Sequence, residues 1–248
     1  MLIREQQMSI FRTVIAGTFE TQMVEHLTNF ARTHAESIGE TRLRQVVQLG
    51  IARAEGYGWT QQGPVEFYLE LMVMLGADCD TDSQYPWIEE ILKASQNQML
   101  RADRLHSKTM QYHHAVFGPA FEYEIQAIRR LLAAEGDLVS SVTRSDHVDM
   151  VMLLQWAYPE KATFLGPETQ QRFVDCGQVL SSRNGLTEPL GVALFTALLF
   201  AFGHGCCTDP QYPWIAAAIK PTGGKVVERL QSIFRKYLEQ AAIELQRS

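Results

Sequence analysis

The segment 82–88, Asp-Ser-Gln-Tyr-Pro-Trp-Ile, occurs again at 209–215 as Asp-Pro-Gln-Tyr-Pro-Trp-Ile, 127 positions later. With this offset held fixed, 21 of the 71 aligned positions from 23 to 93 are identical, and no gap is needed. Self-similarity of this kind is the mark of a repeated structural unit. We therefore predict a duplicated chain, with one copy at 1–120 and the other at 121–248.

Apolar residues recur at helical spacing along most of the chain, as in Met23, Leu27 and Phe30, and strict alternation is nearly absent. This pattern predicts an all-α fold of two tandem helical bundles related by pseudo-symmetry. The predicted helices of the first copy are 8–17, 20–36, 41–55, 62–75, 85–95 and 97–116. Those of the second copy are 121–135, 145–157, 168–182, 188–202, 211–219 and 224–246.

The chain has 46% hydrophobic and 20% charged residues, which is typical of a globular protein with a sizeable core. Its first ten residues lack the apolar run of a secretory signal. The longest apolar stretch, from Leu190 to Gly203, is shorter than the roughly 20 residues of a membrane span, so we predict a buried helix there. These features favour a cytoplasmic protein without a membrane partner.

The repeated turn carries a structural prediction. Asp82 and Asp209 each follow an apolar helix, and such a carboxylate can accept backbone N–H groups and open the next helix. Pro210 then fits the first helical position. The aromatic residues that follow are expected to anchor the turn on the preceding helix. The structural motif comprises Asp82, Tyr85, Pro86, Trp87, Asp209, Tyr212, Pro213 and Trp214.

A metal site is a competing interpretation of the first turn. Asp78, Asp80, Asp82 and Glu89 have the spacing of ligands in a calcium-binding loop. However, Ser83 stands where that loop needs glycine, and the second copy replaces three of the ligands with Gly205, Cys207 and Ala216. A zinc site at His204, Cys206 and Cys207 is weaker still, because only Cys206 matches a cysteine of the first copy. We predict no metal and no cofactor.

The two copies differ most in charge. From 54 to 92 there are eight acidic residues and no Lys or Arg, whereas 181–219 carries a net charge of only −1. We predict that the first segment is an acidic outer face and that the matching alanines 193, 197, 216 and 217 form an apolar face hidden by packing. The predicted partner-binding residues are Glu66, Glu70, Asp78, Asp80, Glu89 and Glu90. A solvated, solubilising surface is the alternative; a nucleic acid would be repelled by this face, and a basic protein would be attracted.

No nucleophile elbow, phosphate loop, dinucleotide fingerprint or H-E-x-x-H motif occurs in the sequence. Glu66 and Glu70 are four residues apart on one predicted helix, but such pairs are usually solvated. We therefore predict no catalytic residues and a protein that is not an enzyme.

Three stretches resemble a group of poorly characterised helical bacterial proteins encoded near type VI secretion and polymorphic-toxin genes. They are Gly50-Ile-Ala-Arg-Ala-Glu-Gly-Tyr-Gly-Trp-Thr, Tyr68-Leu-Glu-Leu-Met-Val-Met-Leu-Gly and Asp80-Thr-Asp-Ser-Gln-Tyr-Pro-Trp. The second copy resembles the group more loosely, through Phe200-Ala-Phe-Gly and its own Tyr-Pro-Trp turn. This chain departs from the group at Cys79, Cys207 and Ser83.

The resemblance implies a toxin-neutralising immunity protein, or an adaptor that loads an effector. Our leading hypothesis is a non-enzymatic, cytoplasmic protein that binds a cognate toxin or effector with a basic surface. The alternatives are an effector chaperone, a metalloprotein or enzyme that uses the Asp78–Glu89 loop, and a self-assembling scaffold. A homodimer is compatible with each of these roles.

Overall fold

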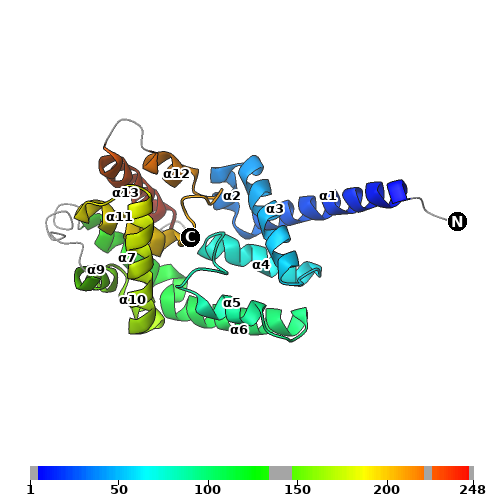
Figure 1. Cartoon of the computed structure of the whole chain (residues 1–248), viewed down its shortest axis with the longest axis horizontal. Coiled ribbons are helices and arrows are strands. Elements are labelled where there is room, and N and C mark those ends of the chain that lie inside the picture. Colours follow the sequence, from blue (N-terminus) through cyan, green and yellow to red (C-terminus); the bar gives the residue numbers. More distant parts are fainter. Residues whose placement is uncertain (1–4, 134–146, 221–224, 246–248) are drawn as a thin grey trace.

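A computed structural model describes residues 5–133, 147–220 and 225–245, which contain helices and no strand. The predicted all-α class is therefore confirmed for the part of the chain that the structure describes. Helices α2 to α4 lie toward one end of the molecule, and α9, α11 and α13 lie toward the other (Figure 1). The beginning of α1 projects away from the body of the molecule.

The helices and their bounds are as follows. The first half contains α1 (Glu5–Phe30), α2 (Arg32–Ile38), α3 (Glu40–Gly56), α4 (Gln62–Leu75), α5 (Pro86–Leu92) and α6 (Gln98–Val116). A short 3₁₀ turn, η1 (Pro119–Phe121), leads into α7 (Glu122–Ala133). The second half continues with α9 (His147–Ala157), α10 (Pro159–Arg183), α11 (Pro189–Phe202), α12 (Pro213–Ile219) and α13 (Val226–Leu245).

Several elements of the two halves correspond at the sequence offset of 127. Both bounds of α4 and α11 differ by this number, and so do both bounds of α5 and α12. Gly39 separates α2 from α3, and Gly166 kinks α10 at the equivalent position, each with a positive φ that favours glycine. Local conformation therefore follows the repeat in the sequence.

The predicted helices agree with the structure in position, with two exceptions. The predicted segments 8–17 and 20–36 are wrong as separate helices, because α1 runs continuously to Phe30 and α2 is a helix of its own. The helical segment 159–165, which opens α10, was not predicted. The long apolar run does form a buried helix, α11. Predicted positions 134–135, 145–146, 224 and 246 lie outside the described residues.

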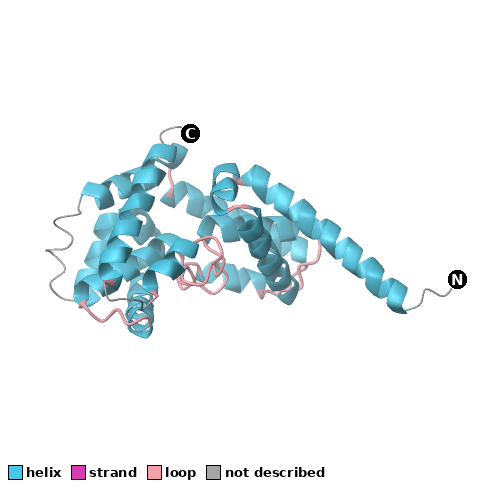
Figure 2. Ribbon diagram, turned by 90° about the horizontal axis from the view of Figure 1, so that it is seen from above, coloured by secondary structure: helices cyan, strands magenta, loops and turns pink. Residues whose placement is uncertain are grey.

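The buried apolar side chains form two clusters. One contains residues from Met23 to Val116, and the other contains residues from Ile128 to Leu238. Tyr158 packs against both clusters. The change from one cluster to the other falls between α6 and α7, and the exact limits of 1–120 and 121–248 stay a prediction. Loops lie at the centre of the molecule, between helices of the two halves (Figure 2).

Candidate binding site between the two halves

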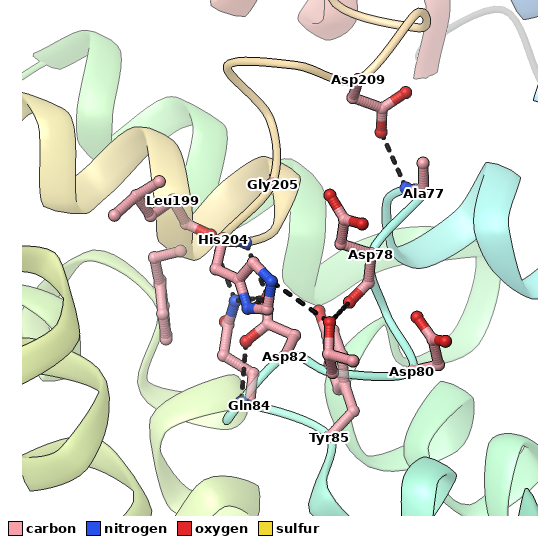
Figure 3. A network of polar contacts seen from close by, with 12 residues as sticks. Ala77, Asp78, Asp80, Asp82, Gln84, Tyr85, Leu199, His204, Gly205 and Asp209 are labelled. Carbon is pink, nitrogen blue, oxygen red and sulfur yellow. Dashed lines mark hydrogen bonds and ion pairs between the residues drawn. The ribbon is translucent and has the colours of Figure 1, made fainter. Parts of the chain in front are cut away.

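The two repeated turns bind each other's half of the molecule. Asp82 Oδ2 accepts the backbone N–H of His204 at 2.7 Å, and Asp209 Oδ2 accepts the backbone N–H of Ala77 at 2.7 Å (Figure 3). His204 and Ala77 are the second residues after the ends of α11 and α4. Each carboxylate therefore holds the chain just beyond the long apolar helix of the other half.

The glutamines of the repeated motif make a second reciprocal pair. The Gln84 side-chain amide donates to the Leu199 carbonyl at 3.1 Å, and the Gln211 amide donates to the Met72 carbonyl at 2.9 Å. Both carbonyls lie in the last turn of a helix and also accept the N–H of the glycine after it, so the amide uses the second lone pair of each oxygen. These four bonds thus form two equivalent pairs across the boundary.

Within each turn the carboxylate also organises its own segment. Asp82 Oδ1 accepts the backbone N–H of Gln84 at 2.8 Å, and Asp209 Oδ1 accepts that of Gln211 at 2.9 Å. This is the local bond expected of an Asx turn. The carboxylates do not cap the next helix, so that part of the prediction is wrong.

The helices begin one residue later than the predicted 85–95 and two residues later than the predicted 211–219. Tyr85 and Tyr212 are the N-cap residues, and Pro86 and Pro213 occupy the first helical position. The placement of Pro210 at that position is therefore wrong. The aspartates do not cap these helices because their carboxylates already accept N–H groups from their own turn and from the other half.

The two tryptophans pack differently. The Trp214 ring lies 5.4 Å from that of Phe202 in the preceding helix and stacks on Tyr237 of α13. The Trp87 ring instead lies 6.4 Å from Tyr112 in the following helix, α6. Anchoring by ring contact on the preceding helix, as predicted, is seen for Trp214. Trp87 makes its ring contacts with Tyr85 and Tyr112, because α4 offers no aromatic side chain there.

The close approach of the two halves requires small residues. A Cβ on Gly76 would lie 2.5 Å from the Phe202 carbonyl oxygen, so only glycine fits. A Cβ on Gly205 would lie 1.7 Å from Oδ2 of Asp78, its counterpart in the repeat. The Asp78 carboxylate fits here because the equivalent residue, Gly205, has no side chain. Two aspartates at this pair of positions would collide.

The predicted acidic face is partly internal. Arg53 forms ion pairs with Asp78 and, at 3.4 Å, with Asp80, which is only 4% exposed and accepts the Tyr57 hydroxyl at 2.9 Å. The placement of Asp80 on an outer face is therefore wrong, because its carboxylate is buried against these two partners.

The glutamates of the predicted face differ in their surroundings. Glu70 pairs with His26 at 2.8 Å, and Glu89 pairs with Lys93. Glu66 accepts the Gln62 amide at 2.8 Å, and Glu90 is exposed. The carboxylates thus do not make one continuous acidic surface, and their role in partner binding stays a prediction.

The calcium-loop alternative finds no support in the arrangement of these side chains. Asp78 and Asp80 face Arg53, whereas Asp82 bonds to the other half. No group of three His, Cys, Asp or Glu side chains in the described segments is arranged to hold a metal ion.

A cavity of about 1320 Å³ lies between the two halves. Equivalent positions of α4 and α11 line it, among them the pairs Phe67 with Leu194 and Glu70 with Ala197. Side chains from α6, α7, α9 and α13 complete the wall, and most are apolar. Ala197 thus faces the cavity. Ala217, another predicted member of a hidden face, is exposed instead.

Lys161 is the most deeply buried charged side chain of the cavity wall, at 4% exposure. Its ammonium donates to the Phe200 carbonyl and, at 3.3 Å, to the Tyr85 hydroxyl. Burial lowers the pKa of Lys161 to about 8, against the opposing charges of Asp82 and Glu124. No carboxylate of the described residues forms an ion pair with this ammonium.

Glu124 of α7 also lines the cavity. Its carboxyl group makes no hydrogen bond or ion pair with any described residue. Burial raises the pKa of Glu124 to about 7, and the charge of Lys161 opposes this shift. Near neutral pH this carboxyl group therefore carries a proton for a large part of the time.

The residue that corresponds to Lys161 in the first half is His34. Its Nε2 lies 3.1 Å from Oε1 of Gln211. On the other side, Oε1 of Gln84 is buried and has no hydrogen-bond partner among the described residues. The two sides of the boundary therefore differ at the cavity wall. His34 contacts the glutamine of the opposite turn, whereas Lys161 donates to the Phe200 carbonyl and to the Tyr85 hydroxyl.

Comparisons with known proteins add no family to this description. No family model, no curated protein and no solved structure matches the chain. Among the helices described, none has the length and apolar character that crossing a membrane would require.

Proposed function

We propose that this chain is a binding protein, formed by two duplicated helical bundles, and that it holds its ligand in the cavity between them. The common offset of helix bounds and the two reciprocal pairs of hydrogen bonds support the duplication. In a two-fold interface, each partner makes the same contacts with the other. The halves meet in this way, as two subunits of a homodimer would.

The observation that carries the proposal is the cavity itself. Ligand sites are typically concave, about 300–1,000 Å³ in volume, and mainly apolar with a few polar groups. The cavity exceeds this size at about 1320 Å³ and combines apolar walls with Lys161 and Glu124. Two other polar groups of the wall, His34 and Glu70, are engaged by Gln211 and His26, which favours binding over catalysis.

Binding is tested with a neutral apolar dye whose fluorescence rises when it leaves water. We expect saturable binding at one site per chain. Ala197→Trp should weaken it about tenfold or more, because the indole fills space in the cavity. Ala217→Trp, at an exposed alanine of α12 outside the cavity, should bind as the wild type does. Equal dye affinity in both variants would place the site elsewhere.

A protein partner is the second candidate, since the resemblance implies a toxin or effector and several carboxylates remain accessible. Glu55 and Glu90 are exposed, and Glu66 is partly so. We expect replacement of these three by glutamine to slow association with a basic protein encoded beside this chain about tenfold at low salt, and to have little effect at high salt.

Stopped-flow association at two salt concentrations measures this effect. Replacement of Glu36, Glu168 and Glu188, three exposed glutamates elsewhere, removes the same charge and serves as the control. If the two triple variants slow association equally, net charge matters and this face does not.

A further inference from the structure

Lys161 lies where the two halves and the cavity meet. It belongs to α10 of the second half, yet one of its two acceptors is the Tyr85 hydroxyl of the first half. Its ammonium lies 4.5 Å from the centre of the Phe200 ring and 5.6 Å from that of Tyr85. The groups in direct contact with this cation are thus aromatic rings and neutral oxygen acceptors, and the charges of Asp82 and Glu124 act on it without forming an ion pair.

A buried cation without an ion-pair partner is costly, because neutral acceptors replace water only in part. A ligand anion at Lys161 would offset that cost with a charge-assisted hydrogen bond. Burial raises the pKa of Glu124 to about 7, and the protonated form of its carboxyl group can donate a hydrogen bond to an anion.

The buried positive charge of Lys161 suits a ligand that carries a single negative charge. Within the described part of the chain, Lys161 is the one lysine or arginine buried in the wall; Arg235 also lines the cavity but pairs with Glu239 at 2.9 Å. Phosphate groups are typically bound by clusters of cations or by arginine forks. A single lysine without a second buried cation matches a monocarboxylate better.

The rest of the cavity wall suits an apolar chain. It is built from aromatic and aliphatic side chains of both halves, among them Phe117, Leu131, Leu153, Leu194 and Leu238. Burying each methylene of a ligand there is worth about 0.8 kcal/mol. A long alkyl chain therefore supplies affinity, and its head group supplies orientation.

We propose that the cavity binds a long-chain monocarboxylate, with the alkyl chain along the apolar wall and the carboxylate on Nζ of Lys161. This inference rests on the proposed binding function and names the ligand class of that same site.

The test compares three amphiphiles of equal chain length, hexadecanoate, hexadecanol and hexadecylamine, as competitors of the neutral dye. All are used on the full chain below the concentrations at which they form micelles. We expect hexadecanoate to displace the dye at concentrations about tenfold lower than hexadecanol, and hexadecylamine to be the weakest. Equal displacement by acid and alcohol, or stronger displacement by the amine, overturns the proposal.

Lys161→Met supplies the second arm. The variant should lose the preference for the acid over the alcohol, with both competitors measured against the affinity of the variant itself for the dye. Lys220→Met, at an exposed lysine outside the cavity, should retain that preference. A preference that survives in Lys161→Met also overturns the proposal.

The two claims fail in different ways. Saturable dye binding without a preference for the acid contradicts the proposed ligand class but is still consistent with the proposed binding function. Native mass spectrometry of the wild-type chain measures binding of the dye and of hexadecanoate. If neither binds saturably, both the ligand class and the binding function are contradicted. Because the comparison of the three amphiphiles uses the wild type, it does not depend on the folding of a variant.

Discussion

Asp82→Ala is expected to lower the free energy of unfolding by about 3–5 kcal/mol. The Asp82 carboxylate is 2% exposed and accepts three N–H groups, two from Gln84 and one from His204. Alanine leaves these donors without an acceptor, and an unsatisfied buried donor costs about 1–3 kcal/mol. The loss is large because one of the three donors belongs to the other half of the molecule.

Asp209→Ala should have an effect of the same sign but a smaller size. Asp209 accepts Ala77 and Gln211 in the equivalent geometry, yet burial raises its pKa, so removal of its charge offsets part of the loss. Urea unfolding of both variants measures the two losses. Asp103→Ala, at an exposed position of α6, should change stability by less than about 0.5 kcal/mol.

The double variant is informative about the interface. If the two turns hold one shared boundary, the second substitution should cost less than it does alone, because residues in one network are not additive. Fully additive losses would mean that each turn stabilises only its own segment. If Asp82→Ala and Asp209→Ala lower the free energy of unfolding no more than Asp103→Ala does, the bonds between the two turns do not stabilise the boundary.

The helices could be predicted because their limits are encoded locally. Apolar periodicity marks the helical faces, and Gly39, Gly76 and Gly203 adopt positive φ at helix ends. The segment 159–165 was missed because Pro159 suggests a boundary, whereas it occupies the first position of a helix. Local signals of this kind say where a helix ends, but they do not identify its neighbours.

The partners of the repeated turn could not be predicted from capping rules. Asp82 and Gln84 reach residues more than 110 positions away, and local reasoning assigned the aspartate to the next helix. Likewise, the acidic count from 54 to 92 stopped one residue short of Arg53 and of Lys93, which pair with three of those carboxylates. Arg53 lies 25 and 27 positions from Asp78 and Asp80, so no local pattern showed that pairing, whereas Lys93 lies only four residues from Glu89, just beyond the end of the segment.

Neither Lys161 nor Glu124 belongs to a sequence motif. Each is an ordinary charged residue in an amphipathic segment, and only the packing of two halves makes it part of a cavity wall. Their pKa shifts arise from burial, which depends on tertiary structure. The alignment at an offset of 127 places Lys161 opposite His34, and this difference between two basic side chains is the one signal that the sequence offered for Lys161.

Lys161→Met is expected to stabilise the free protein by roughly 2 kcal/mol at pH 7. Burial lowers the pKa of this lysine from 10.5 to about 8. A shift of that size costs on the order of 3 kcal/mol, since one pKa unit is 1.36 kcal/mol. Loss of the hydrogen bonds to Phe200 and Tyr85 offsets about 1 kcal/mol of the gain. The melting temperature should therefore rise by about 4–8 °C.

The pH dependence gives the sign of the effect. Between pH 8 and 10.5 the unfolded chain binds more protons at Lys161 than the folded chain does, so the stability of the wild type rises with pH through this window. The cost is fully present below pH 8. The advantage of Lys161→Met should therefore be largest at pH 7 and should shrink as the pH approaches 10.

Thermal unfolding of the wild type and the variant at pH 7 and pH 9.5 tests this directly, with Lys220→Met as the exposed control. If the variant is less stable than the wild type at pH 7, the hydrogen bond from Lys161 to the Phe200 carbonyl stabilises the protein more than the buried charge destabilises it. A more stable variant would show that the free protein carries an uncompensated charge at the cavity wall. Strain of this kind is typical of sites that bind or react, because the ligand removes the cost when it arrives.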